Sequence, residues 1–533
     1  MNIKNIMRFI IFASYIVFFM ICERMMGCSG SGIMGISFLV YSMFFLVFMG
    51  SVKETLAKMV SIRRHRGFVD NAKRIFGYCV FYCAVVSVVG IAASYFLSGK
   101  ISEKVCGDRS IEAVLIILGV FFALEAFSAT IRGYYIGCNG SIFLTIGELV
   151  KCISMIVLTP IGIKYLGGLG TKAANLHKND FLTTVYGSMG AAVALCVADI
   201  LMLIVLLLGL KGALRNDSFS FNEVRSRDGF KSFTRAFVPL TLGWLQKNIM
   251  PTLSIFVLVC FYCRFCGKHG IDYVTMYSEA GALFVPAFVV FFVALMCFKK
   301  YAGLYRKKLR VDFKKDDKKS LVSDFNILLK NAMVVAIPMS LSIMTLSGKI
   351  AVAFFGCERE SAGKMLLQVG ILVLFACFDY LFAEVLECIG HDMLGFACRA
   401  VGFVLSLIMA LSLNSKDFNI TFVVTALLIG YGACAVMGGS FVVRFMKLRT
   451  NDIVARLVKV VIASGILVVV DIIFAKLIPA NAIAVIIAVF VGYVFYMLVL
   501  MASKAFSTKD IQGLKGSLLY YPLTLLGNVF RIR

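Results

Sequence analysis

Long apolar runs alternate with short polar segments along the whole chain. The first six runs are residues 6–22, 33–52, 75–97, 111–129, 142–163 and 188–210; the next six are residues 238–263, 283–298, 327–355, 365–386, 395–413 and 420–443; the last two are residues 457–478 and 482–501. A helix rises about 1.5 Å per residue, so about 20 apolar residues cross the hydrocarbon core of a bilayer. The pattern therefore predicts an all-α polytopic membrane protein with about 14 transmembrane helices.

The composition excludes a soluble globular protein. The 533 residues are 60% hydrophobic and only 16% charged, whereas an ordinary soluble domain has about 25% charged residues. Most of the 17 Cys lie inside apolar runs, where a thiol behaves as a small hydrophobic group. The stretch CFYCRFCGKH spaces Cys260, Cys263, Cys266 and His269 as metal ligands are often spaced. Because three-residue spacing drifts around a helix, we interpret this run as chance enrichment and predict no metal site.

Lys and Arg are concentrated in four loops between the apolar runs. These loops are residues 53–74, 211–235, 299–319 and 444–459. Basic residues accumulate in cytoplasmic loops, so this distribution predicts cytoplasmic N- and C-termini in a multi-pass membrane protein. Residues 6–22 are followed by no small-residue cleavage site, and we interpret them as the first span rather than a signal peptide.

The most basic loop, KKYAGLYRKKLRVDFKKDDKK, raises the question of nucleic-acid binding. It offers no folded module that reads bases, so nucleic acid is excluded as a partner. At the membrane surface the same charges are expected to attract anionic lipid headgroups. The formal net charge of +25 therefore reflects the orientation of the chain in the membrane. Membrane lipids are the predicted partner of this loop.

Two halves of the chain correspond weakly. Basic loops begin at Lys53 and at Lys299, and the turn YYIGCNGSIF in the first half corresponds to ECIGHDMLGF in the second. We predict an N-terminal lobe of six helices at residues 1–210, a C-terminal lobe of six helices at residues 211–449, and two further helices with a cytoplasmic tail at residues 450–533. Such repeats place a substrate path between the lobes, in a central cavity.

Ionisable residues occur inside the apolar runs of both halves. Each costs about 2.5–3.5 kcal/mol to insert and therefore requires a partner or a hydrated cavity. Glu148 and Lys151, three residues apart, share a helix face, as do Glu125 and Arg132, seven apart. Such pairs either tie helices together or line a polar path, and spacing leaves both roles open. The other candidates are Asp199, Lys247, Lys349, Asp379, Glu384, Glu387, Arg399 and Asp471.

Lys247 stands in a polar interruption of the seventh run. Trp244, Gln246 and Asn248 surround it, and Pro239 and Pro251 lie on either side. Two prolines at this spacing predict a broken helix, which is tolerated at membrane depth where a cavity satisfies the backbone. Lys247 is therefore a candidate for facing the central path.

The chain lacks the motifs of an enzyme. It has four His, no His-Glu-x-x-His, no P-loop and no Gly-x-Ser-x-Gly. We predict no catalytic residue, no cofactor and no enzymatic activity.

Three segments resemble bacterial polysaccharide exporters of the stage V sporulation protein B type. They are GSVKETLAKMVSIRRHRGFVDNAKRIF after the second run, IRGYYIGCNGSIFLTIGELVK, and LECIGHDMLGF in the second half. These exporters belong to the multidrug, oligosaccharidyl-lipid and polysaccharide exporter superfamily, which also contains the lipid II flippases. The resemblance implies two six-helix lobes around a central cavity, with two additional C-terminal helices.

The resemblance also implies positions for functional residues. Lys58 matches the family's Lys after the second span, Arg132 the Arg of the turn, and Lys151 the basic residue of the fifth span, while Glu148 matches the family's Glu with a slip of one residue. The first run, FIIFASYIVFFMICER, lacks the arginines that lipid II flippases carry in their first span. This departure argues against lipid II itself as the substrate.

We therefore predict a flippase or exporter that moves a lipid-linked oligosaccharide or cell-wall precursor across the bacterial plasma membrane by alternating access. The predicted phosphate-contacting or gating residues are Lys53, Lys58, Arg132, Lys151 and Lys247, and the predicted hydrogen-bond acceptors are Glu148 and Glu387. Its partners would be the lipid-linked sugar, membrane lipids and a coupling ion, Na⁺ or H⁺. The alternatives are a cation-coupled multidrug exporter of the same superfamily and a membrane enzyme of glycan assembly.

Overall fold

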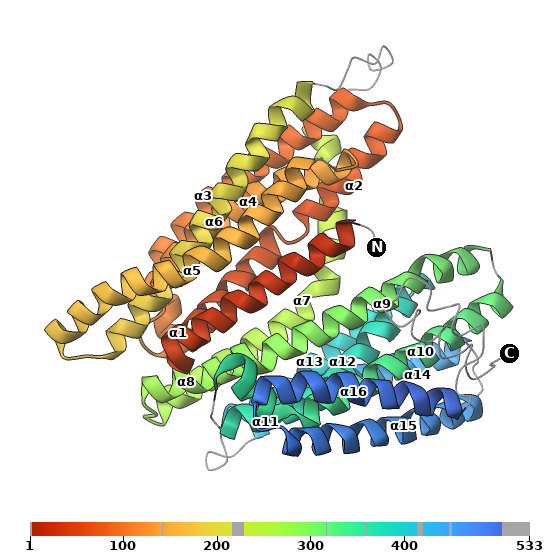
Figure 1. Cartoon of the computed structure of the whole chain (residues 1–533). Coiled ribbons are helices and arrows are strands. Elements are labelled where there is room, and N and C mark those ends of the chain that lie inside the picture. Colours follow the sequence, from red (N-terminus) through yellow and green to blue (C-terminus); the bar gives the residue numbers. More distant parts are fainter. Residues whose placement is uncertain are drawn as a thin grey trace. The chain divides into compact units, whose positions relative to one another are not determined.

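The computed structural model describes residues 3–140, 142–215, 229–315, 317–357, 360–412, 419–446 and 450–503. Regular structure in these ranges is entirely helical (Figure 1), which confirms the predicted all-α fold. Parts of the predicted basic loops 211–235 and 444–459, and the tail 504–533, lie outside the described residues. By its internal contacts the chain forms two compact units, Met1–Gly281 and Ala282–Arg533. The division predicted from the repeat, after residues 210 and 449, stays a prediction.

The first unit contains seven helices and most of an eighth. They are α1 (Ile3–Phe48), α2 (Val52–His65), α3 (Val69–Cys106), α4 (Glu112–Gly137), α5 (Ile142–His177), α6 (Phe181–Arg215), α7 (Phe230–Lys268) and α8 (Tyr273–Ala282).

The second unit begins where α8 continues into a π-helical stretch. Its elements are η2 (Leu283–Phe288), α9 (Val289–Lys314), α10 (Lys318–Thr345), α11 (Ser347–Ile350), η3 (Ala351–Phe355), α12 (Glu360–Cys388), α13 (Asp392–Ser412), α14 (Thr421–Met446), α15 (Thr450–Leu477) and α16 (Asn481–Ala502).

Helix α1 is two arms that fold back on each other at Gly27. The backbone there has φ 70° and ψ −178°, a conformation that glycine adopts without steric penalty. The ring centroids of Phe19 and Phe38 are 5.8 Å apart, although 19 residues of a straight helix span about 28 Å. The two arms are therefore antiparallel, and they correspond to the first two predicted spans.

Thirteen stretches of the described helices are long and apolar enough to cross a membrane. The first, Ile10–His65, contains both arms of α1, so it accounts for two of the fourteen predicted segments. The other twelve overlap the remaining predicted runs one for one. The chain is thus a multi-pass membrane protein.

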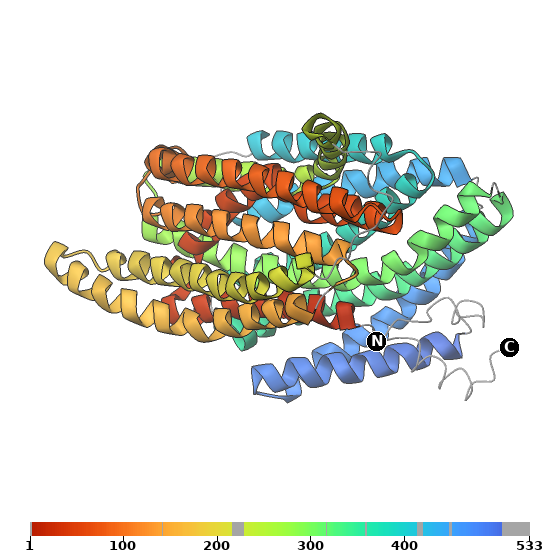
Figure 2. The same cartoon turned by 90° about the horizontal axis from the view of Figure 1, so that it is seen from above.

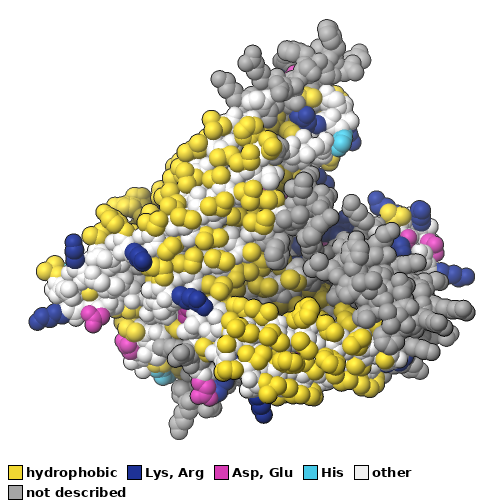
Figure 3. Space-filling view, viewed as in Figure 1, with side chains coloured by type: hydrophobic (Ala, Val, Ile, Leu, Met, Phe, Trp, Pro, Cys, Tyr) yellow, Lys and Arg dark blue, Asp and Glu magenta, His cyan; other side chains and the backbone are white. Residues whose placement is uncertain are grey.

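The exterior of the described helices is apolar along their lengths. Exposed side chains include Phe96, Leu208, Ile462 and Phe490, each more than half accessible. Figure 3 shows one face on which hydrophobic side chains cover the lengths of the helices and charged side chains lie mostly toward their ends. Such a surface is unfavourable in water and suits contact with lipid.

Each unit has one helix that packs against most of its neighbours. In the first unit α4 packs against α1, α2, α3 and α6, and in the second α12 packs against α9, α10, α13 and α14. Helices α5 and α6 run side by side (Figures 1 and 2). They approach closely at Gly162 and Gly190, where a Cβ on either residue would collide with the backbone of the other.

Helix α7 is continuous through both of its prolines. It runs from Phe230 to Lys268 with Pro239 and Pro251 inside it, so the prediction of a broken helix around Lys247 is wrong. The carbonyls that each proline leaves without a donor are one turn earlier, and a membrane helix accommodates them by local adjustment without ending.

Candidate functional site

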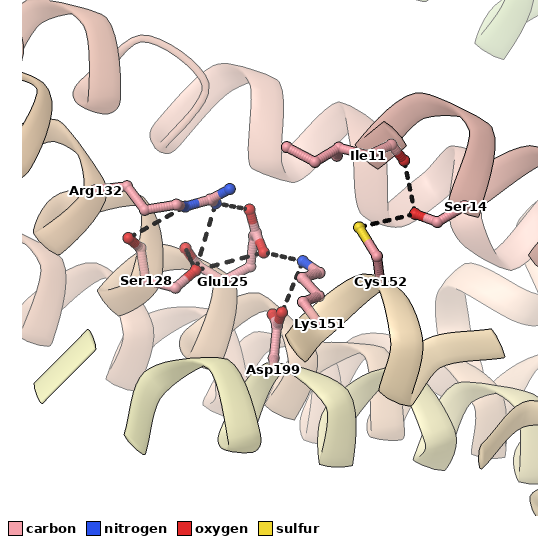
Figure 4. Close-up of polar contacts among 8 residues, drawn as sticks. All are labelled: Ile11, Ser14, Glu125, Ser128, Arg132, Lys151, Cys152 and Asp199. Atoms are coloured by element: carbon pink, nitrogen blue, oxygen red, sulfur yellow. Dashed lines mark hydrogen bonds and ion pairs between the residues drawn. The ribbon is translucent and has the colours of Figure 1, made fainter. Parts of the chain in front are cut away.

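A cluster of charged side chains lies inside the first unit, on α4, α5 and α6. Glu125 of α4 forms ion pairs with Arg132 of the same helix and with Lys151 of α5, whose Nζ is 2.6 Å from Glu125 Oε2 (Figure 4). The same Nζ is 2.6 Å from Oδ1 of Asp199 on α6. Lys151 therefore bridges two carboxylates and joins three consecutive helices.

The helical repeat brings the α4 members together. Glu125, Ser128 and Arg132 are three and four residues apart and share one face of the helix. Arg132 Nε donates to the backbone carbonyl of Ser128 at 3.3 Å, and a terminal nitrogen donates to Ser128 Oγ at 3.4 Å. These bonds, together with the ion pair to Glu125, hold the Arg132 guanidinium along the helix.

The cluster is removed from solvent. Asp199 is 0% exposed, Lys151 is 5% exposed and Arg132 is 7% exposed. The ammonium of Lys151 also lies over two aromatic rings, 5.7 Å from the centroid of Tyr15 and 5.5 Å from that of Phe121. Buried charges persist when they are paired and hydrogen-bonded, and ring faces add further attraction for a cation.

A cavity of about 130 Å³ lies beside this cluster, within the first unit. At about 30 Å³ per water molecule, it has room for about four waters. Its lining comes from the first arm of α1 and from α4, α5 and α6: Ile11, Ser14, Tyr15, Glu125, Arg132, Glu148, Lys151, Cys152, Met155 and Met202.

Two polar groups in the lining have unused bonding capacity. Glu148 accepts no hydrogen bond and forms no ion pair within the described part of the chain, although it is only 9% exposed. One terminal nitrogen of Arg132 carries no bond in Figure 4. The lining has two carboxylates, Glu125 and Glu148, and two cations, Arg132 and Lys151. It can therefore hydrate or bind a small polar group.

Three of the seven predicted site residues meet in this cavity. Arg132, Glu148 and Lys151 line it together. Two residues beside them, Glu125 and Asp199, were noted in the sequence only as intramembrane charges. The signal for Glu125 was its seven-residue spacing from Arg132, whereas no spacing links Asp199 to Lys151, because they lie on different helices.

The other four predicted residues lie elsewhere. Lys53 and Lys58 are on α2, where Lys53 is half-buried and Lys58 exposed, and Lys247 is exposed on α7. Glu387 belongs to the second unit. None of the four lines the cavity.

Glu387 takes part in a second charged cluster, at one end of α12. Its Oε1 is 2.7 Å from Arg306 Nη2 and 2.6 Å from Arg310 Nη2, and Glu384 Oε2 is 3.2 Å from Arg306 Nε. Partial burial lowers the pKa of the Arg306 guanidinium, but the two carboxylates outweigh it and the net shift is upward. This cluster fastens the basic extension of α9 to α12.

The spaced cysteines of α7 do not form a metal site in the described residues. No three of the ligand atoms of Cys260, Cys263, Cys266 and His269 lie within 4.8 Å of one another there. Cys263 and Cys266 are buried, while the exposed His269 ring stacks on Phe265 with centroids 3.9 Å apart.

Comparison with known proteins identifies the fold. No family model and no curated protein matches the chain. Among solved structures, lipid II flippase MurJ in an inward closed conformation matches with a TM-score of 0.64 and 14% identity, over 93% of this chain and 97% of that one. An inward-facing multidrug resistance transporter of the MATE family, MOP superfamily, matches with a TM-score of 0.58 and 13% identity, over 82% of this chain and 95% of that one.

A third structure, MATE in the straight conformation, has a TM-score of 0.51 and 14% identity, over 84% of this chain and 97% of that one. At such identities the likeness establishes a shared fold with transporters of the MOP superfamily. The subfamily predicted from the sequence, the stage V sporulation protein B type, stays a prediction.

Proposed function

We propose that this protein is a flippase that moves a lipid-linked oligosaccharide or cell-wall precursor across the bacterial plasma membrane by alternating access. The observation that carries the proposal is a polar cavity of charged side chains inside a fold shared with a lipid II flippase. Within hydrocarbon, each sugar hydroxyl without a partner costs several kcal/mol, on the order of 2–7. A protein path with its own charges replaces water around the headgroup while the lipid tail stays in the bilayer.

The extent of the structural match favours a flippase over a drug exporter. The lipid II flippase covers 93% of this chain, whereas the two drug-exporter structures cover 82% and 84%. The chain has fourteen membrane-length segments where two six-helix lobes require twelve. Helices α15 and α16 are the segments beyond those lobes in the predicted arrangement.

The residues of the cavity divide into two roles. The free terminal nitrogen of Arg132 is suited to a phosphate oxygen, because guanidinium groups bind phosphate through directed N–H bonds. Lys151 is held by Glu125 and Asp199 at 2.6 Å each, so in this conformation it serves as a gating charge rather than a phosphate ligand. Glu148 is suited to accept hydrogen bonds from sugar hydroxyls.

The four residues outside the cavity have roles in other parts of the cycle in this proposal. Lys53, Lys58 and Lys247 attract the anionic headgroup before it enters, since all three have accessible or partly accessible side chains. Glu387 acts as an acceptor that the Arg306 and Arg310 pairs hold in place.

A cation-coupled multidrug exporter is the second candidate function. The observation in its favour is the carboxylate of Glu148, which lines the cavity and forms no ion pair in the described part of the chain. Such a carboxylate can bind Na⁺ or a proton, or the positive charge of a drug. In the flippase the same group would bind the coupling ion or a sugar hydroxyl.

The two functions are separated by transport with purified protein. We would reconstitute the full chain in vesicles that contain a fluorescent lipid-linked oligosaccharide and measure how much becomes accessible on the opposite leaflet. The flippase predicts accelerated exposure that Arg132→Gln slows about tenfold or more, while Arg109→Gln, an exposed charge paired with Glu103, leaves it unchanged. Transport of a cationic dye with no movement of the lipid-linked sugar would support the exporter instead.

A further inference from the structure

A second buried carboxylate, Asp471, lies in the second unit on α15. It is 0% exposed and falls within the membrane-length stretch Leu457–Leu477. Its Oδ2 accepts a hydrogen bond from Ser342 Oγ at 2.9 Å and is 3.3 Å from Thr345 Oγ1, both on α10. The carboxyl therefore connects α15 to α10 through hydroxyl groups.

No cation among the described residues neutralises Asp471. Neither Lys, Arg nor His of the described residues lies within ion-pair distance of it, and its Oδ1 accepts no hydrogen bond there. The titratable group that interacts with it from α16 is Tyr493, and a tyrosine hydroxyl is neutral near pH 7. A carboxylate ion in this position would be an unpaired charge inside a membrane protein, which is strongly unfavourable.

Helix α16 limits the space for a hydrated metal ion at Oδ1. Helix α16 passes so close that a Cβ on Gly492 would lie 2.8 Å from Oδ1. A neutral carbonyl oxygen tolerates a nearby Cα–H group, and such contacts are weakly favourable. The glycine thus closes the site on the side where an ion would need further oxygen ligands.

Apolar side chains pack next to Asp471, toward the nearer ends of α10, α15 and α16. Phe474 and Ala475 follow Asp471 by one turn of α15. They belong to a packed layer with Leu346, Ile350, Phe354, Val485, Ala488 and Val489.

The hydroxyl geometry provides an acceptor for a proton on Asp471. Thr345 Oγ1 is 3.0 Å from the carbonyl of Leu341, which is closer than Asp471 Oδ2 at 3.3 Å. A threonine hydroxyl has a single proton, and donating it to the carbonyl leaves a lone pair toward Oδ2. Ser342 donates to the same carboxyl oxygen at 2.9 Å.

We propose that Asp471 is a proton-binding site that fastens α15 and α16 to α10. The carboxylate takes one proton from water to become a carboxylic acid; Oδ2–H donates to Thr345 Oγ1, and Oδ1 remains a carbonyl oxygen against Gly492. The proton leaves only when α15 and α16 separate from α10 and water enters. Proton occupancy and the docking of the C-terminal helix pair are thereby linked.

Infrared spectroscopy of the purified full chain tests this site without any substrate. At pH 7, the spectrum of the wild type minus that of Asp471→Asn should contain the carbonyl stretching band of one protonated carboxyl. Asp392→Asn, which removes an exposed aspartate at the start of α13, should show no such loss. Identical carbonyl regions for the wild type and Asp471→Asn would overturn the proposal.

Thermal unfolding provides the second measurement and excludes a sodium site. Asp471→Asn keeps the shape of the neutral acid, so its Tm at pH 7 should match that of the wild type in NaCl and in choline chloride alike. Asp471→Ala, which cannot bond to Ser342, should have a lower Tm. A Na⁺-specific rise in the Tm of the wild type that Asp471→Asn abolishes would contradict proton binding. Failure here would leave the proposed flippase function standing, because no transport is measured.

Discussion

Asp199 in the first unit and Asp471 in the second are both 0% exposed, yet their charge is handled in different ways. Asp199 pairs with the ammonium of Lys151 at 2.6 Å, next to a cavity with room for waters. Asp471 has two hydroxyl neighbours, a glycine against its second oxygen and no cationic partner among the described residues. The first arrangement is a charged network and the second is neutral.

The difference bears on which of the two regions could respond to the anionic cargo proposed above. A network of fixed charges beside a cavity has two or more pairings to exchange, because Lys151 can remain with either carboxylate when the other changes partner. A neutral, buried carboxyl forms only hydrogen bonds between helices. We therefore propose that the first unit contains the gating charges and that Asp471 has a docking function.

Removal of Lys151 should have the largest effect. Lys151→Met leaves Asp199 buried without a cation, and breaking a buried ion pair in this way typically costs about 3–5 kcal/mol. Expression should fall and the Tm of the purified protein should drop by many degrees. The double variant Lys151→Met, Asp199→Asn should regain most of that Tm, since Glu125 still pairs with Arg132. If Lys151→Met were as stable as the wild type, the ion pairs of Lys151 would not stabilise the protein by this amount.

The two aspartates should respond unequally to the same substitution. Asp199→Asn removes an ionic acceptor from Lys151, and the expected loss is about 1–3 kcal/mol. Asp471→Asn replaces a neutral acid by a neutral amide and should change stability by less than about 0.5 kcal/mol. Urea or thermal unfolding of both variants under identical conditions measures this contrast. Equal losses would remove the distinction between a charged and a neutral site.

Much of the fold was predictable from the sequence, because apolar length alone specifies membrane segments. The fourteen runs and the all-α fold follow from hydrophobicity sustained over about 20 residues, which does not depend on any periodic pattern. The continuity of α7 through Pro239 and Pro251 did not follow, because local proline chemistry predicts a break while the surrounding membrane helix keeps the backbone paired.

The candidate site was predictable only within single helices. Glu148 with Lys151, and Glu125 with Arg132, follow from helical spacing. The pairing of Lys151 with Asp199 depends on the packing of α5 against α6, which spacing along the chain does not encode. For the same reason Lys53, Lys58, Lys247 and Glu387 resemble site residues in the sequence although they do not line the cavity.

Loss of the hydroxyl partner should have a smaller effect than loss of a charge. Ser342→Ala removes the 2.9 Å bond to Asp471, and a hydrogen bond of this kind contributes about 1 kcal/mol. Ser412→Ala is the matched control, because its hydroxyl bonds to a carbonyl of its own exposed turn. The Tm of Ser342→Ala should fall below that of Ser412→Ala. A reversed order would argue against the hydroxyl contact.

Neutralising Glu148 should have the smallest effect on stability. Glu148→Gln breaks no ion pair or hydrogen bond of the described structure, so the Tm should stay the same or rise slightly. Glu148→Gln is informative in the transport assay: if Glu148 binds the coupling ion, the dependence of transport on that ion should weaken. Unchanged dependence on Na⁺ and on pH would assign the carboxylate to sugar hydroxyls.

The most direct test of the central claim is the leaflet in which a lipid-linked sugar precursor resides after the protein is depleted from living cells. The account predicts that the precursor accumulates in the inner leaflet and that its exposure outside slows at once, before polymer synthesis declines. Outer-leaflet exposure at the normal rate in depleted cells would contradict it.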